Sequence, residues 1–134
     1  AIAVDTPKGL FAPVIQDCDK KSLEEISKLI DEYSKKAKEG SLSLEELTNS
    51  TFTVTNLGPY NIELFYPIIN PPNCAILGVG KIGKKVVVIE DKLIPRYRGY
   101  LTLVFDHRIV DGGPASKFLN YIKDLIENPY LLLI

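Results

Sequence analysis

The stretch LTLVFDHRIVDGG, residues 101–113, combines a strand pattern, a turn pattern and the start of a helix. Its first five residues are apolar or β-branched, which favours a buried strand. The glycines at 112 and 113 suit a sharp turn or the close approach of a ligand, because they lack a Cβ atom. An apolar stripe at helical spacing then predicts a helix. The stripe comprises Ala115, Phe118, Leu119, Ile122, Leu125 and Ile126.

Residues 74–106, just before the turn, predict a β-meander. Apolar and β-branched runs alternate there with turn residues. We expect turns at Gly83 and Lys84 and again at Asp91 and Lys92, where glycine or charged residues interrupt the apolar runs. The last strand of this meander leads directly into the turn.

Helix signals mark the first half of the chain. Ser22 and Glu25 have the spacing of a capping box, which predicts a helix that Gly40 ends. Ser43 and Glu46 repeat the spacing and predict a shorter helical turn. Strand patterns lie at residues 2–5, 12–15 and 51–58. The order of elements indicates an α/β fold of the α+β sandwich type, with a mixed β-sheet flanked by helices.

Composition excludes several classes of function. The chain has 134 residues, 46% of them hydrophobic, and a formal net charge of −1. One domain, or part of a larger one, is therefore expected, and nucleic-acid binding is not, because that requires a basic excess. No apolar run approaches the ~20 residues of a membrane span. Cys18 and Cys74 lack metal-ligand spacing and suggest intracellular thiols, so we expect no metal site.

His107 is the single histidine of the sequence. A lone histidine is usually a surface or partly buried residue without a chemical role. Its place at a strand end, with Asp106 beside it and Asp111 four residues later, favours a general base instead. The sequence holds no GxSxG nucleophile elbow, and neither cysteine lies near His107 in sequence. A base without a nucleophile of its own suits a nucleophile carried by the substrate, such as a thiol.

The motif DHRIVDG, residues 106–112, resembles the HxxxDG signature of the dihydrolipoyl acyltransferases, the core enzymes of 2-oxoacid dehydrogenase complexes. Other stretches resemble the same family in order and spacing. They are AVDTPKGLFAPVI (3–15), SLEEISKLIDEYSKKAKEG (22–40), TFTVTNLGPYNIELFYPIINPPNCAILGVG (51–80) and ENPYLLLI (127–134). The resemblance implies a chloramphenicol acetyltransferase-like fold. It covers residues 1–134 as the later part of a catalytic domain, with the N-terminal portion, the lipoyl domain and the peripheral subunit-binding domain expected outside them.

The resemblance also implies roles for individual residues. His107 matches the catalytic histidine, which takes the proton of the attacking thiol of coenzyme A or dihydrolipoamide. Asp111 matches the aspartate that holds the active-site loop, and Gly112 is the motif glycine, expected at the cofactor site. Thr55 stands where the family usually has a serine that hydrogen-bonds the oxyanion. From the residues alone, Thr55 fits an ordinary strand threonine better.

Partners follow from the same resemblance. It implies a homotrimer in which His107 acts with Thr55 of the adjacent subunit, and a larger hollow core of trimers held partly by the apolar tail YLLLI, residues 130–134. Packing of the tail on its own helix is the alternative. Coenzyme A or acyl-CoA is the expected substrate, with the lipoyl group carried on another domain. The 2-oxoacid dehydrogenase and dihydrolipoamide dehydrogenase components are expected to bind through other domains, in the cytoplasm or the mitochondrial matrix.

Three questions stay open at this point. Residues 55–73 look more like the acetyl or branched-chain members of the family than the succinyl ones. A free-standing CoA-dependent acetyltransferase of the same fold, or a structural core scaffold with impaired catalysis, are the alternative functions. In this fold the motif aspartate typically pairs with an arginine, and the sequence offers Arg96, Arg98 and Arg108 without indicating the partner.

Overall fold

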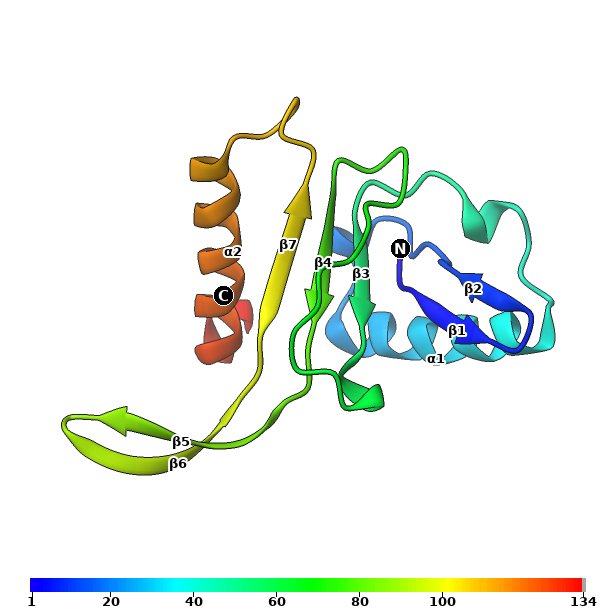
Figure 1. Cartoon of the computed structure of the whole chain (residues 1–134). Helices are drawn as coiled ribbons and strands as arrows, with labels where there is room; N and C mark the ends of the chain where they lie inside the picture. The colour runs from blue at the N-terminus through cyan, green and yellow to red at the C-terminus, as the bar shows by residue number, and fades with distance from the viewer. Residues whose placement is uncertain (134) are drawn as a thin grey trace.

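In the computed structural model, which describes residues 1–133, the central sheet has three strands in the order β3–β4–β7 (Figure 1). They are β3 (Thr53–Asn56), β4 (Ala75–Val79) and β7 (Leu101–Phe105). β3 runs parallel to β4, whereas β7 runs antiparallel to it. Ala75, Ile76 and Leu77 are buried, since β4 has a strand on each side. The predicted mixed sheet is confirmed.

The chain between β4 and β7 forms a separate two-stranded sheet. Its strands β5 (Gly83–Ile89) and β6 (Lys92–Arg98) are antiparallel and extend away from the central sheet (Figure 1). Between the two sheets, the Gly80 amide donates to the Tyr100 carbonyl at 2.9 Å. Residues 80–82 lie opposite residues 99–100, so one arm has an extra residue and the ladder bends there, as at a β-bulge. The predicted meander is therefore one long, bent hairpin.

The two turns expected within residues 74–106 have different outcomes. Gly83 and Lys84 lie inside β5, where both pair with β6, so the turn predicted there is wrong. The second turn is displaced by one residue, because Lys92 begins β6 and pairs with Ile89. Glu90 and Asp91 form the turn, with φ of 48° and 60°. Positive φ at both central residues is what a type I′ hairpin turn requires.

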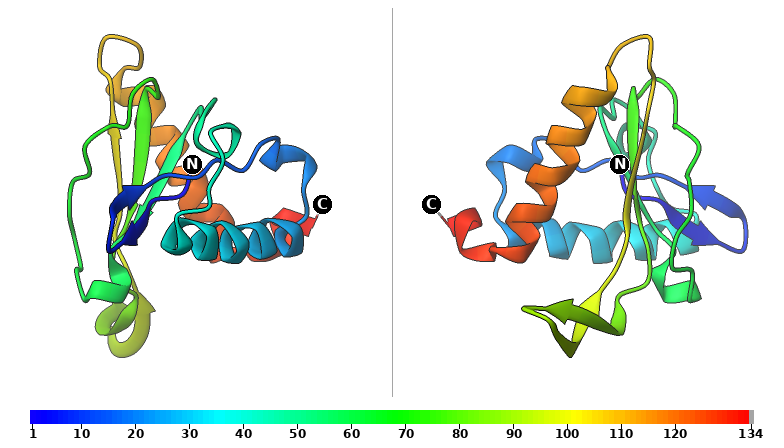
Figure 2. Two further views of the ribbon diagram at one scale, coloured as in Figure 1. Left: turned by 90° about the vertical axis from the view of Figure 1, so that its right-hand side faces the viewer. Right: turned by 60° about the vertical axis from the view of Figure 1, so that its left-hand side comes forward.

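Two helices pack on the sheet, α1 (Leu23–Glu39) and α2 (Gly112–Glu127). The predicted capping box of α1 is confirmed: the Glu25 amide donates to Ser22 Oγ at 3.2 Å, and the Ser22 amide donates to Glu25 Oε2 at 2.7 Å. Gly40 ends α1 with φ of 74°. Figure 2 shows both helices on one side of the sheet. Short 3₁₀ helices are η1 (Cys18–Lys20), η2 (Glu45–Leu47), η3 (Gly58–Tyr60) and η4 (Pro129–Leu133).

The N-terminal strands form a small hairpin, β1 (Val4–Thr6) with β2 (Gly9–Phe11). The second strand, β2, lies between the two N-terminal segments in which strands are predicted, residues 2–5 and 12–15. Residues 12–15, predicted as a strand, have no regular structure. Val14 and Ile15 are nevertheless buried, and the Val14 amide donates to the Glu46 carbonyl at 2.8 Å. The apolar pattern at 12–15 thus reports burial rather than strand formation.

An extended segment, residues 61–73, crosses the face of the sheet opposite the helices (Figure 2). Two strand glycines make the close approach possible. A Cβ atom at Gly78 would meet the side chains of Thr102 and Phe65, and one at Gly80 would collide with the main-chain oxygen of Glu63. Thr102 Oγ1 donates to the Phe65 carbonyl at 2.9 Å and ties the segment to β7. The segment therefore lies directly on the sheet.

Candidate active site

The loop that follows β7 places His107 at one end of the central sheet. The Asp106 amide donates to the Cys74 carbonyl at 2.8 Å, so the β4–β7 ladder continues to the residue before His107. The chain then turns, and Asp111 is the N-cap of α2. The His107 side chain is 71% exposed. The prediction that a strand delivers the histidine to a loop is confirmed.

Asp111 lies close to His107 without a firm contact. Asp111 Oδ1 is 3.7 Å from His107 Nδ1, longer than a hydrogen bond, and its side chain is 84% exposed. Gly112 and Gly113 begin α2, and a Cβ atom at either would meet no atom of the described chain within 4 Å. The subunit itself therefore does not require glycine there. The loop-holding role of Asp111 and the ligand contact of Gly112 stay predictions.

Arg108 pairs with Asp106 rather than with Asp111. Its Nη2 lies 2.6 Å from Asp106 Oδ2, and its Nε lies 3.0 Å from Oδ1. These side-chain hydrogen bonds, followed by one from the Arg108 amide, lower the pKa of Asp106 to about 2. Among the ion pairs of the described residues, none joins Asp111 to an arginine. The sequence shows Asp106 and Arg108 on either side of His107, but it does not indicate whether Arg108 pairs with Asp106 or with Asp111.

Thr55 lies far from His107 within one subunit. Thr55 is half-buried on β3, opposite Gly78, and Gly78 lies opposite Thr102 on β7. β7 ends at Phe105, and His107 lies beyond that end. With a strand spacing of about 4.8 Å and a rise of about 3.3 Å per residue, Thr55 lies about 14 Å from Phe105 at the end of β7, and His107 follows two residues later. The structure therefore does not bring them together within one chain.

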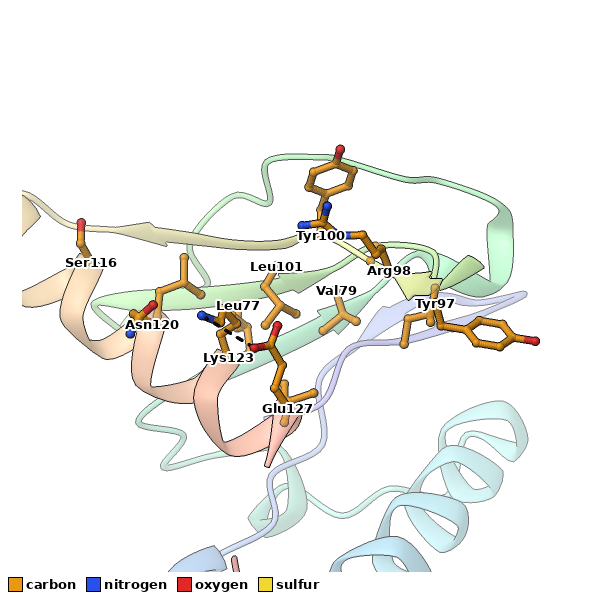
Figure 3. A pocket seen from close by; sticks show the side chains of 15 residues that line it. Leu77, Val79, Tyr97, Arg98, Tyr100, Leu101, Ser116, Asn120, Lys123 and Glu127 are labelled. Carbon is orange, nitrogen blue, oxygen red and sulfur yellow. Dashed lines mark ion pairs between the residues drawn. The ribbon is translucent and has the colours of Figure 1, made fainter. Parts of the chain in front are cut away.

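A cavity of about 640 Å³ lies between α2 and the sheet, at the base of the β5–β6 hairpin (Figure 3). Leu77, Val79 and Leu101 line its sheet side. Asn120 and Lys123 of α2 line its rim. None of the predicted site residues is in its wall. This cavity could not be predicted from the sequence, because apolar residues of the strands and the helix are equally expected in a packed core.

Other types of site have no counterpart in the part of the chain that is described. Residues 1–133 hold no group of three or more His, Cys, Asp or Glu side chains arranged to bind a metal ion. Cys18 and Cys74 are free cysteines. Across the same residues, no helix has both the length and the apolar character needed to cross a membrane.

Two curated relatives of this chain are acyltransferase components of 2-oxoacid dehydrogenase complexes. The chain is 45% identical, over all of its length, to an Arabidopsis thaliana mitochondrial succinyltransferase component of a 2-oxoglutarate dehydrogenase complex, and covers 29% of that protein. It is 43% identical, over 99% of its length, to a Staphylococcus epidermidis acetyltransferase component of a pyruvate dehydrogenase complex. The match covers 31% of that protein. The chain thus spans about a third of the length of these relatives. Both acyl types match at similar identity, so the acyl group stays a prediction.

Solved structures show the same fold. An Azotobacter vinelandii dihydrolipoamide acetyltransferase matches with a TM-score of 0.95 and 35% identity, over 99% of this chain and 55% of its own. It was studied for the roles of a serine, a histidine and an asparagine in its catalytic mechanism. A truncated catalytic core of the 2-oxoacid dehydrogenase multienzyme complex from Thermoplasma acidophilum matches with a TM-score of 0.86 and 44% identity. This match covers 96% of this chain and 56% of the Thermoplasma chain. The predicted chloramphenicol acetyltransferase-like α/β fold is confirmed.

The model of the family described as 2-oxoacid dehydrogenases acyltransferase (catalytic domain) matches residues 1–134. The resemblance seen in the motif around His107 is therefore confirmed over the whole chain. This chain belongs to the catalytic-domain family of the 2-oxoacid dehydrogenase acyltransferases.

Proposed function

We propose that this chain forms the part of an acyltransferase site that carries His107, and that it moves an acyl group between a dihydrolipoyl group and coenzyme A. One observation carries the assignment of residues. In the Azotobacter enzyme the serine lies 52 positions before the histidine, and the asparagine lies four positions after it. Thr55 and Asp111 lie at the same offsets from His107. The close superposition of the two folds supports equal places for the three residues.

The proton transfers fall to His107. A thiol has a pKa near 8.5 and is mostly protonated at neutral pH, so it needs a base to become a nucleophile. The His107 imidazole takes the thiol proton. The thiolate sulfur then forms a bond to the thioester carbonyl carbon, and the carbonyl electrons move onto its oxygen. When this intermediate collapses, the original C–S bond breaks and the leaving sulfur takes the proton back from His107.

The oxyanion of that intermediate needs a hydrogen-bond donor. Thr55 supplies a hydroxyl, and such a donor contributes about 2.7–4 kcal/mol to transition-state binding. Because Thr55 and His107 of one chain are on opposite parts of the sheet, the Thr55 that serves a given His107 belongs to a neighbouring subunit. The base and the oxyanion donor therefore come together only at an interface between two subunits.

Assembly is part of the proposal. We expect homotrimers that associate into a larger core, since a matching solved structure is the cubic core of a pyruvate dehydrogenase multienzyme complex. Tyr130, Leu131 and Leu132 are exposed in the single subunit and suit a contact between trimers. The dehydrogenase components are expected to bind through other domains. The expected compartment is the cytoplasm, or the mitochondrial matrix in a eukaryote; the Arabidopsis relative is described as mitochondrial.

Acyl transfer to dihydrolipoamide, measured with the full-length protein, tests the proposal. Acetyl-CoA, isobutyryl-CoA and succinyl-CoA are compared, with the His107→Ala variant alongside. We expect His107→Ala to lower kcat by about 10²–10⁴-fold, because it removes the general base. The oligomer should keep its size in gel filtration. Equal rates in the two proteins, or no transfer by either with the oligomer intact, would overturn the proposed function.

A further inference from the structure

The main chain of Asp106 anchors the whole His107 loop. Its amide extends the sheet by its hydrogen bond to the Cys74 carbonyl. Its carbonyl accepts the amides of Ile109 and Val110, at 2.9 and 3.0 Å. These three bonds enclose the turn that contains His107. The path of the loop is therefore set from the residue immediately before the histidine.

The Asp106 side chain closes the same turn from the other direction. Its Oδ1 accepts the main-chain amide of Arg108 at 2.9 Å, which forms an Asx-turn across His107. Both oxygens also accept hydrogen bonds from the guanidinium of Arg108. The Asp106 side chain is 21% exposed, whereas the Arg108 side chain is 88% exposed. The carboxylate thus lies against the protein, and the arginine covers it from the solvent side.

His107 lies between these two clamped residues. Its ring packs beside the Phe105 ring, with centroids 5.6 Å apart and planes at 42°. The Asp111 carboxylate, at 3.7 Å from Nδ1, is too distant to hold the imidazole by a direct hydrogen bond. The orientation of the ring in the subunit therefore depends on the main chain of residues 106–108 and on Phe105.

We propose that Asp106 is a positioning residue for His107, and that Arg108 acts with it by clamping the turn that carries the imidazole. This inference rests on the proposed acyl transfer. Asp106 touches no reacting atom. Its effect is to hold the base where the thiol arrives, and a misplacement of about 1 Å lowers a rate by as much as ~10²-fold.

Two variants of the clamp are compared in the full-length assembled protein. Asp106→Asn removes the charge and keeps an oxygen that can accept the Arg108 amide. Arg108→Gln removes the guanidinium and leaves all the bonds made by Asp106 main chain intact, so it tests the clamp even where Asp106→Asn folds poorly. Asp17→Asn is the matched control, since Asp17 forms an exposed ion pair with Lys20 at 3.2 Å.

We expect Asp106→Asn and Arg108→Gln to lower kcat by about 10- to 100-fold while the KM for coenzyme A stays close to the wild-type value. The oligomer size should match that of Asp17→Asn, and both variants should stay folded under the assay conditions. The double variant should be no slower than Asp106→Asn alone, because both changes break one clamp.

Wild-type kcat in both variants, with His107→Ala inactive, would overturn the positioning role and leave the proposed function standing. A rise in KM together with loss of the oligomer would also overturn it, because Asp106 would then serve stability alone. Unchanged transfer in His107→Ala would instead overturn the proposed function, and this inference with it.

Discussion

Within one subunit, Thr55 lies on β3 at one edge of the central sheet, and His107 lies in the loop just after β7 at the other edge, so the two residues are displaced along the sheet as well as across it. The register places Thr55 level with Thr102, five residues before His107. No change of side-chain rotamer spans that separation, because β4 lies between β3 and β7 and pairs with both. The relationship has a direct consequence: a site that uses both residues must be shared between subunits.

The oxyanion role of Thr55 predicts a graded response to substitution. Thr55→Ser keeps the hydroxyl and should retain kcat within a few-fold of the wild type, since it also restores the residue usual in the family. Thr55→Ala removes the donor and should lower kcat by about 10²–10³-fold. Steady-state acyl-transfer kinetics provide the measurement. Equal rates for the serine and alanine variants would show that the hydroxyl does no catalytic work.

The crossing of the sheet by residues 61–73 predicts a stability difference between two glycines. Gly80→Ala should destabilise the fold by about 1–3 kcal/mol, because its Cβ would press on the Glu63 main chain. Gly113→Ala is the control, because a Cβ atom there would meet no other atom within 4 Å. This substitution in α2 should raise the free energy of unfolding by about 0.5–1 kcal/mol. Urea unfolding of both variants measures the difference. Equal midpoints would contradict the close packing of the segment on β4.

The Asp106–Arg108 pair predicts a specific pH window for stability. The pKa of Asp106 is lowered from 3.8 to about 2 in the folded protein by hydrogen bonds from Arg108. A carboxyl whose pKa is lowered on folding stabilises the protein above its unfolded pKa, and loses that contribution as the pH falls through its folded pKa. The stability difference between wild type and Asp106→Asn should therefore stay constant above about pH 4 and shrink toward pH 2.

Unfolding by urea at several pH values between 7 and 2 checks this window, with Asp17→Asn as the control. A difference that first disappears near pH 6 would mean that another group is titrating. Because Asp106 stays ionised throughout the neutral range, its charge adds no limb to the pH profile of acyl transfer there.

Local signals in the sequence predicted local structure well. The capping boxes at Ser22 and Ser43, the end of α1 at Gly40 and the stripe of α2 depend on neighbours within one or two helical turns. The same holds for His107 at a strand end, because the strand pattern and the turn adjoin each other in sequence.

The errors concern long-range pairing. Gly83 carried a turn signal, yet β4 pairs with β7 and β5 with β6, and that choice depends on the tertiary structure. Arg108 pairs with Asp106 rather than with Asp111, and this pairing depends on the geometry of the folded loop. Gly78 and Gly80 did carry a usable signal, because glycine inside a strand often marks the close approach of another chain segment. That signal predicts a close approach to β4, and the structure identifies residues 61–73 as the approaching segment.

The central claim is that His107 works with Thr55 of a neighbouring subunit, and subunit mixing tests it most directly. Inactive Thr55→Ala and His107→Ala proteins are dissociated, mixed in equal amounts and reassembled, and exchange is verified by native mass spectrometry. We predict that activity returns to about a quarter of the wild-type value, since in a random mixture about one in four interfaces holds both intact residues. Mixed oligomers that form and stay inactive would contradict the shared site.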